Sequence, residues 1–196
     1  MKNKFPIKVE RKTFETEVKV FWDPYTSGQI KIDTGVGFLD HMLELFAVHG
    51  NFSLEVKAKG DLHVDYHHTV EDVGLTLGEA LRKGLGERKG IARYGEAVIP
   101  MEEALAAVYI DLAERPCFVQ KGKIPVEKIG TFDTELVSEF LKALAIKGAF
   151  TLHVHFLYGE NAHHIVEAGF KALGHALKKA FAPLGKDVVL SSKGVL

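Results

Sequence analysis

Two pairs of adjacent histidines are the residues of this sequence best suited to chemistry. His67-His68 and His163-His164 are each followed, three residues after the second histidine, by a glutamate, Glu71 or Glu167. Residues four apart share one face of a helix, so the first histidine of each pair and its glutamate can direct an imidazole and a carboxylate at one point. The second histidine of each pair is turned away by about 100°. Each pair is therefore suited to serving two different metal ions.

The two histidine segments belong to a longer repeat. Residues 67–85 and 163–181 align at an offset of 96 with nine of 19 positions identical, and the residues before them align at an offset of 98. Such self-similarity predicts two copies of one supersecondary unit. The copies span about residues 5–90 and 92–185 and form one domain, residues 1–196, with pseudo-twofold symmetry. Residues 186–196 are expected to form a polar C-terminal tail.

Apolar spacing predicts the same order of elements in both copies. The expected strands span residues 14–22, 29–33, 52–58, 104–112, 117–120 and 150–157, and the expected helices span 39–49, 66–85, 134–147 and 163–181. Residues 29–33 are expected to pair back after a turn. Gly50 and Gly148 stand where a left-handed glycine commonly ends a helix. The expected fold class is α+β, each half a small antiparallel, mostly four-stranded sheet with two helices on one face.

The repeat supplies two more candidate metal ligands. His41 in the first copy aligns with Glu139 in the second. The eight candidate ligands are then His41, His67, His68, Glu71, Glu139, His163, His164 and Glu167, which is two sets of four. Imidazole and carboxylate ligands without thiolate suit Mn(II), Fe(II), Ni(II) or Zn(II), and Mn(II) fits octahedral N/O sites best. His153 is the alternative to Glu139, although it aligns with Glu55.

Other polar residues have less specific signals. Arg93 and Arg115 are single arginines that would normally be solvated. The segment Leu190–Leu196 contains Ser191, Ser192 and Lys193, whose hydroxyl, ammonium and backbone N–H groups could hold a phosphate, although such ends are commonly frayed. His49 stands at a helix C-terminus, where a cation suits the helix dipole.

Composition excludes several classes of protein. The chain has 196 residues, 25 Lys+Arg and 26 Asp+Glu, and its net charge of −1 offers no electrostatic footprint for nucleic acid or an anionic membrane. The single cysteine, Cys117, cannot form an internal disulfide, which fits a reducing compartment. No apolar run approaches the ~20 residues that span a bilayer, and no secretory signal is apparent. We therefore expect a cytoplasmic globular protein.

Several motifs together resemble one family. The segments Gly37–Leu43, His67–Asp72, Gly86–Gly90, Asn161–Glu167, Phe170–Ala172 and Ser191–Gly194 are similar to motifs of imidazoleglycerol-phosphate dehydratases, in the same order. The resemblance covers nearly the whole chain. It implies a monofunctional hydro-lyase of histidine biosynthesis, in the cytoplasm. It also implies a homo-oligomeric shell of twenty-four subunits with manganese sites at the subunit contacts.

The resemblance also implies residue roles and two manganese ions per active site. One ion would be held by His41, His68, His163 and Glu167, and the other by His67, Glu71, Glu139 and His164. Glu15, in a segment similar to the family's RxTxET motif, is the candidate acid/base, and Glu71 and Glu167 are further candidate catalytic carboxylates. The substrate-binding candidates are Glu15, His49, Arg93, Arg115, Lys171, Ser191, Ser192 and Lys193. Glu102 departs from the family's aspartate.

The implied reaction removes water from imidazole glycerol phosphate and gives imidazole acetol phosphate. Metal ions at both ring nitrogens would stabilise the imidazolate whose electrons expel the hydroxyl. Two alternatives remain open at this point. The same ligands could serve a dinuclear metal hydrolase that acts on a phosphoester, or a non-catalytic metal-binding assembly protein.

Overall fold

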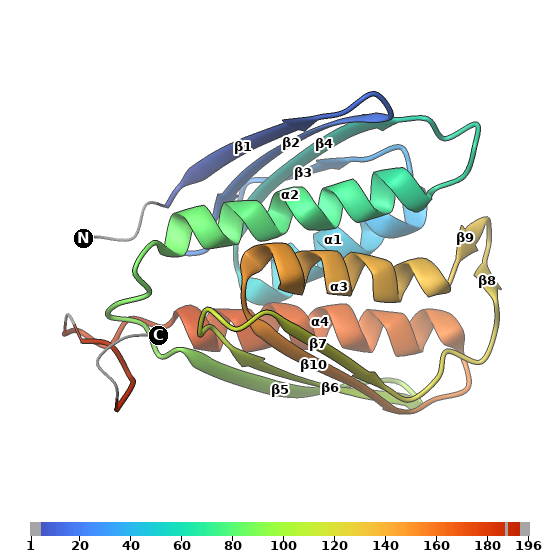
Figure 1. Cartoon of the computed structure of the whole chain (residues 1–196). Coiled ribbons are helices and arrows are strands. Elements are labelled where there is room, and N and C mark those ends of the chain that lie inside the picture. Colours follow the sequence, from blue (N-terminus) through green and yellow to red (C-terminus); the bar gives the residue numbers. More distant parts are fainter. Residues whose placement is uncertain (1–4, 187, 193–196) are drawn as a thin grey trace.

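Four helices lie between two four-stranded sheets in the computed structural model, which describes residues 5–186 and 188–192 (Figure 1). The first half contains β1 (Ile7–Lys12), β2 (Thr16–Asp23), β3 (Ile30–Asp33), α1 (Gly37–Gly50), β4 (Ser53–Gly60) and α2 (His67–Leu85). The second half contains β5 (Tyr94–Met101), β6 (Ala104–Asp111), β7 (Cys117–Lys121), β8 (Lys128–Ile129), β9 (Phe132–Asp133), α3 (Glu135–Gly148), β10 (Thr151–Tyr158) and α4 (Ala162–Phe181). Apart from β8 and β9, both halves have the same order. The duplicated α+β fold is confirmed.

Both sheets are mixed, whereas antiparallel sheets were expected. The strand orders are β1-β2-β4-β3 and β5-β6-β10-β7. In each sheet one outer strand is parallel to its neighbour, β3 to β4 and β7 to β10. The prediction that residues 29–33 pair back as a hairpin is wrong. A helix connects β3 to β4, and a helical crossover returns the chain in the same direction, which makes the two strands parallel.

The helices fill the space between the sheets. Helix α2 packs on β1 and β2 and α1 on β3, while α4 packs on β5 and β6 and α3 on β7. The two layers meet because α2 lies along α3 and α1 lies along α4. In β2 the inward residues Val18, Val20 and Trp22 are at most 3% exposed, so alternation directs one face of the sheet into a common core. None of the helices that the structure describes is long and apolar enough to cross a membrane.

The sequence pattern located all four helices but missed the first strand of each half. Each observed helix begins and ends within two residues of its predicted bounds, but β1 and β5 were not predicted. Only Val9 is buried in β1, and the buried residues of β5 are Gly95 and Ala97. These strands therefore lack the alternation of large apolar side chains by which a strand is recognised.

The glycines at the ends of α1 and α3 have a packing role. Gly50 and Gly148 are the last helical residues, and the left-handed positions belong to Asn51 (φ 57°) and Ala149 (φ 53°). A Cβ on Gly50 would lie 2.2 Å from the ring of Phe52, and one on Gly148 would lie 2.7 Å from the ring of Phe150. The expectation of a glycine in the left-handed position is wrong, since these glycines make room for aromatic rings of the core.

Two further glycines allow the helix pairs to approach closely. Gly78 in α2 and Gly174 in α4 occupy equivalent positions of the repeat. A Cβ on Gly174 would lie 2.5 Å from the carbonyl oxygen of Phe46 in α1, and one on Gly78 would lie 2.6 Å from that of Leu144 in α3. Backbone contact of this kind sets the spacing within both helix pairs.

We predict that Gly174→Ala destabilises the protein. Alanine favours a helix by about 1 kcal/mol over glycine, but the new methyl group would overlap the backbone of α1, and such overpacking typically costs about 1–3 kcal/mol. Thermal or denaturant unfolding should therefore show a lower midpoint. Gly37→Ala is the control, since nothing lies within 4 Å of its added Cβ. Equal stability of the two variants would contradict the prediction.

Candidate active site

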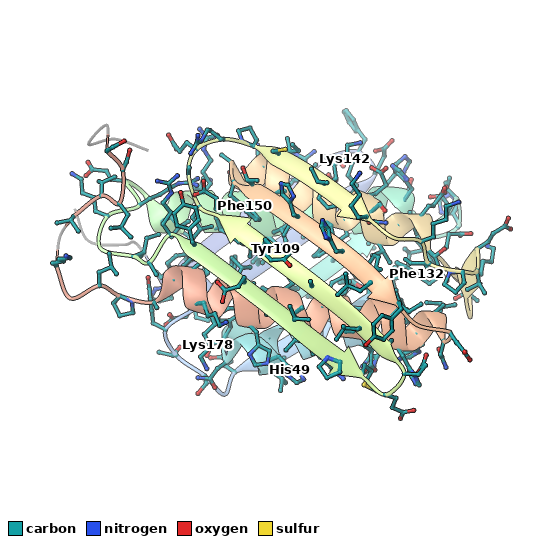
Figure 2. The ribbon with its side chains drawn as sticks, turned by 90° about the horizontal axis from the view of Figure 1, so that it is seen from below. His49, Tyr109, Phe132, Lys142, Phe150 and Lys178 are labelled. Atoms are coloured by element: carbon teal, nitrogen blue, oxygen red, sulfur yellow. The ribbon has the colours of Figure 1, made fainter. Side chains whose placement is uncertain are left out.

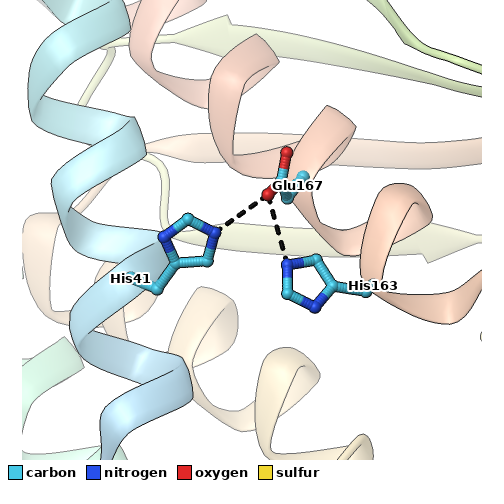
Figure 3. A group of neighbouring side chains, drawn as sticks. All are labelled: His41, His163 and Glu167. Carbon is cyan, nitrogen blue, oxygen red and sulfur yellow. Dashed lines mark hydrogen bonds and ion pairs between the residues drawn. The ribbon is translucent and has the colours of Figure 1, made fainter.

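Three of the predicted metal ligands converge between α1 and α4. His41 comes from α1, while His163 and Glu167 lie one turn apart near the start of α4. Both histidines direct Nε2 at one oxygen of the glutamate, at Nε2–Oε1 distances of 2.9 Å for His41 and 3.2 Å for His163 (Figure 3). The side chain of Asn161 accepts a hydrogen bond from the backbone N–H of His163 and fixes the start of the helix.

The Glu167 carboxylate is held ionised. Burial alone would raise its pKa, but hydrogen bonds from Lys171 and His41 outweigh that effect and hold the pKa at about 2. Lys171 Nζ lies 2.7 Å from Oε2, while Oε1 faces the two imidazoles. Two imidazole nitrogens and a carboxylate oxygen within 4.8 Å of one another form a donor set that fits a divalent ion.

The equivalent residues of the other helix pair do not converge in this way. His67 and Glu71 lie on α2 and Glu139 lies on α3, but the described residues form no group of three that joins them. Glu139 pairs instead with Lys142, at an oxygen–nitrogen distance of 3.6 Å. The chain thus brings together three residues of one predicted set and not those of the other.

The remaining predicted ligands, His68 and His164, each face a carboxylate that was not among the candidates. His68 faces Asp61, with Nδ1 3.0 Å from Oδ2, and His164 faces Glu103, with Nδ1 2.7 Å from Oε2. These hydrogen bonds are the main reason why the pKa of each histidine is raised. The partner carboxylates were not predicted, because nothing in sequence spacing relates Asp61 or Glu103 to a particular histidine.

His153, the alternative to Glu139, lies on the outer face of the second sheet. It is paired across the strands with Tyr109, which Figure 2 shows on that face. Its neighbours in β10, Leu152 and Val154, are buried on the helix side. His153 therefore points away from the helix layer, which includes α2 and its residue His67.

Glu15 lies in the turn between β1 and β2. The hydroxyl of Thr13 accepts hydrogen bonds from the backbone N–H groups of Glu15 and Thr16. Asp72 then anchors both sides of the turn, because it accepts hydrogen bonds from Thr16 and from Arg11. The half-exposed carboxylate of Glu15 is held 3.8 Å from Nε2 of His68. The structure thus places the candidate acid/base beside a predicted metal ligand.

Apart from Lys171, which pairs with Glu167, the cationic candidates that the structure describes form a separate cluster. Arg93 is buried and donates to both oxygens of Asp111, at 2.6 and 2.9 Å, and to the carbonyl of Leu190. Arg115 is 71% exposed and lies 3.4 Å from the same aspartate. Ser191 and Ser192 follow Leu190 directly, and Lys193 lies outside the described residues. The arginines and the tail therefore lie close together, as a single phosphate site would require. Nothing in the sequence indicated that Asp111 would hold the arginines.

His49 is a half-buried residue near the end of α1, where it faces α4. Its ring centroid is 5.4 Å from that of His175. Burial first, then the positive fields of His175 and Lys171, lower the pKa of His49. The neutral imidazole is favoured, so His49 does not supply the cation expected at the end of α1.

Comparison with known proteins identifies the family. The model of the family described as imidazoleglycerol-phosphate dehydratase matches residues 34–177. A relative of that name from Clostridium botulinum (strain Hall) is 54% identical over 190 residues, covering 96% of this chain and 97% of the relative. The chain belongs to the imidazoleglycerol-phosphate dehydratase family. The expectation of a hydro-lyase is thereby confirmed.

Solved structures of the imidazoleglycerol-phosphate dehydratase family share the fold. The enzyme from Staphylococcus aureus superposes with a TM-score of 0.82 at 39% identity, covering 90% of this chain and 98% of that one. The enzyme from Pyrococcus furiosus superposes with a TM-score of 0.84 at 40% identity, covering 96% and 100%.

We predict that Asp111→Asn destabilises this member of the imidazoleglycerol-phosphate dehydratase family in a pH-dependent manner. Burial raises the pKa of Asp111, but Arg93 outweighs it and the pKa lies below the usual 3.8. The pair therefore stabilises the fold fully above that value and loses its effect as the pH falls through the lowered pKa. Denaturant unfolding at pH 7 should show a loss of about 2 kcal/mol.

The same measurement at pH 3 should show a smaller loss. Asp33→Asn, which removes an exposed strand carboxylate, is the matched control and should have little effect at either pH. A difference between wild type and Asp111→Asn that does not shrink at low pH would show that charge pairing is not its cause.

Proposed function

We propose that this chain converts imidazole glycerol phosphate to imidazole acetol phosphate in histidine biosynthesis, and that it requires two divalent metal ions per active site. The observation that supports this best is the convergence of His41, His163 and Glu167. Their donor set fits a metal ion, in a chain whose relatives bear the dehydratase name.

Two sets of four ligands would hold the metals, and Mn(II) is the proposed ion. The first set is His41, His68, His163 and Glu167, and the second is His67, Glu71, Glu139 and His164. When bound, such ions supply Lewis-acid stabilisation of negative charge on the imidazole ring of the substrate. Hydrogen bonds from Lys171 and His41 hold the pKa of Glu167 at about 2, so this carboxylate ligand is ionised at neutral pH.

Proton transfer is assigned to carboxylates of the chain. The substrate loses the hydroxyl group from the carbon beside the ring and a proton from the next carbon, and the resulting enol becomes the ketone. Both the removal of the proton and the departure of water need an acid/base within hydrogen-bond reach. Glu15 suits this role because its turn is fixed by Thr13 and Asp72 while its carboxylate stays accessible. Glu71 and Glu167 are the other catalytic candidates.

The phosphate would be held by the arginine cluster together with the tail. Arg93 is fixed by Asp111 and lies beside the tail, and the exposed Arg115 adds a second guanidinium. Two guanidinium groups and the hydroxyls of Ser191 and Ser192 are donors of the kind that phosphate oxygens accept.

One chain does not supply a complete site on this proposal. The backbone N–H of Arg93 bonds to the carbonyl of Ala180, near the end of α4, whereas Glu167 lies near its beginning. Thirteen helical residues separate those positions, which is roughly 20 Å, more than this substrate spans. The arginine cluster of one subunit would therefore complete the metal site of another. This separation supports sites that are shared between subunits, and the shell of twenty-four subunits is proposed on the family resemblance alone.

We expect turnover to require metal. Protein stripped with a chelator should form no imidazole acetol phosphate, and Mn(II) should restore product formation, because neutralisation of ring charge is lost without the ions. A discontinuous assay of the ketone product gives the measurement. Failure to form product by protein that does rebind manganese would contradict the proposed reaction.

We expect Glu15→Gln to retain manganese and assembly but to lose turnover. The amide cannot accept a proton, and general acid/base catalysis typically contributes about 10²–10⁴-fold, so kcat should fall at least ~100-fold. Glu17→Gln is the control, since Glu17 lies two residues away and pairs with Lys19 at the surface. Normal kcat in Glu15→Gln would exclude Glu15 from the mechanism.

A further inference from the structure

The second histidine of each pair uses the same nitrogen for a carboxylate contact. His68 directs Nδ1 at Asp61 and His164 directs Nδ1 at Glu103, at 3.0 and 2.7 Å. The histidines of the convergent group behave differently, since His41 and His163 both direct Nε2 at Glu167. The second histidine of each pair thus contacts its carboxylate through Nδ1, whereas the two histidines of the convergent group do so through Nε2.

The two carboxylates come from different places in the fold. Asp61 directly follows β4, whereas Glu103 lies in the turn between β5 and β6. The place in the second copy that corresponds to Asp61 is Leu157–Gly159, which has no carboxylate. Equivalent histidines thus receive the same contact from unrelated segments. This points to a requirement at the histidine rather than to a by-product of the repeat.

Glu103 is itself held in place. Its Oε1 atom accepts the backbone N–H groups of Glu160 and Asn161, at 3.1 and 2.7 Å, and its Oε2 atom faces His164. Both oxygens are occupied, so this carboxylate is poorly suited to serving as a metal ligand. Glu102, which lies 3.9 Å from the same Nδ1, is 71% exposed. The contact is therefore better explained as support for the imidazole than as a separate cation site.

We propose that Asp61 and Glu103 are positioning residues that orient His68 and His164 and hold them in the tautomer that offers Nε2 to a metal ion. A carboxylate that accepts the Nδ1 proton leaves the lone pair on Nε2, fixes the ring and raises its basicity. The inference rests on the proposed function, because an unprotonated Nε2 has this role only if His68 and His164 bind metal ions. It adds Asp61 and Glu103 to the residues on which the site depends.

The contact with Glu15 is consistent with this assignment. Nε2 of His68, the nitrogen that Asp61 leaves free, lies on the side of Glu15, at 3.8 Å. His68, as a metal ligand, and Glu15, as the acid/base, would then act on the same substrate molecule. Loss of Asp61 would leave the His68 ring free to turn, and both groups would lose their common orientation.

The test compares Asp61→Ala and Glu103→Ala with the unchanged full-length protein. The dissociation constant for Mn(II), measured from the electron paramagnetic resonance signal of the free ion, should rise about ten- to a hundredfold in each variant. Asp61→Asn and Glu103→Gln keep a hydrogen-bond acceptor without its charge, so their constants should lie between. Glu160→Ala removes an exposed neighbouring carboxylate and should leave the affinity unchanged.

A second readout reports the tautomer directly. Magic-angle-spinning ¹⁵N NMR of histidine-labelled, metal-free protein separates Nδ1–H from Nε2–H imidazoles. One histidine in each alanine variant should lose its Nδ1–H signal, whereas a merely structural role would leave the tautomers unchanged. The signals are assigned with His68→Asn and His164→Asn.

The outcomes separate this inference from the proposed function. Unchanged tautomers, or unchanged Mn(II) affinity in protein that binds the ion, would overturn the positioning role. If the unchanged protein binds no Mn(II), the proposed function fails, and the tautomer measurement still decides whether the carboxylates orient the histidines. Should one alanine variant fail to fold, its amide variant and the other pair provide the same comparison.

Discussion

The close approach of helices at Gly174 and Gly78 is the constraint on which the rest of the structure depends. Without a Cβ at these positions, α4 contacts the backbone of α1, and α2 contacts that of α3. Only at that spacing can His41 on one helix reach within hydrogen-bond distance of Glu167 on another. Each helix also carries part of a sheet, so the same contacts set the separation of the outer layers. Packing and site geometry therefore share one cause.

The two halves use this common frame differently. Lys171 has Leu75 at its equivalent position, and His41 has Glu139. Burial disfavours an ionised Glu167, and the ammonium of Lys171 offsets that effect, which allows a half-buried cluster of two imidazoles and one carboxylate. The other pair has no ammonium at that position, and its three predicted ligands form no group in the described chain. The two halves share one backbone plan, but they surround the two sets of predicted ligands with different electrostatics.

Sequence reasoning identified what is periodic or repeated and missed what depends on distant contacts. The helices and the HHxxE segments follow from spacing within a few turns. Strand direction in β3 did not, because it depends on the helix that returns the chain to β4. Gly50 has the expected type for a helix end but is required by the ring of Phe52. Asp111 binds an arginine 18 residues away, and Glu103 binds a histidine 61 residues away. No local pattern encodes such pairs.

The arrangement along α4 links the proposed catalysis to assembly. The start of the helix carries His163 and Glu167, and its end adjoins Arg93 through the carbonyl of Ala180. A rigid helix cannot shorten to bring these ends to one small substrate, because each residue adds about 1.5 Å. Packing at Gly174 in turn holds this helix on α1. On the proposed function, a chain built in this way would offer its metal ligands to one substrate and its arginines to another, so self-association would be needed to complete a site.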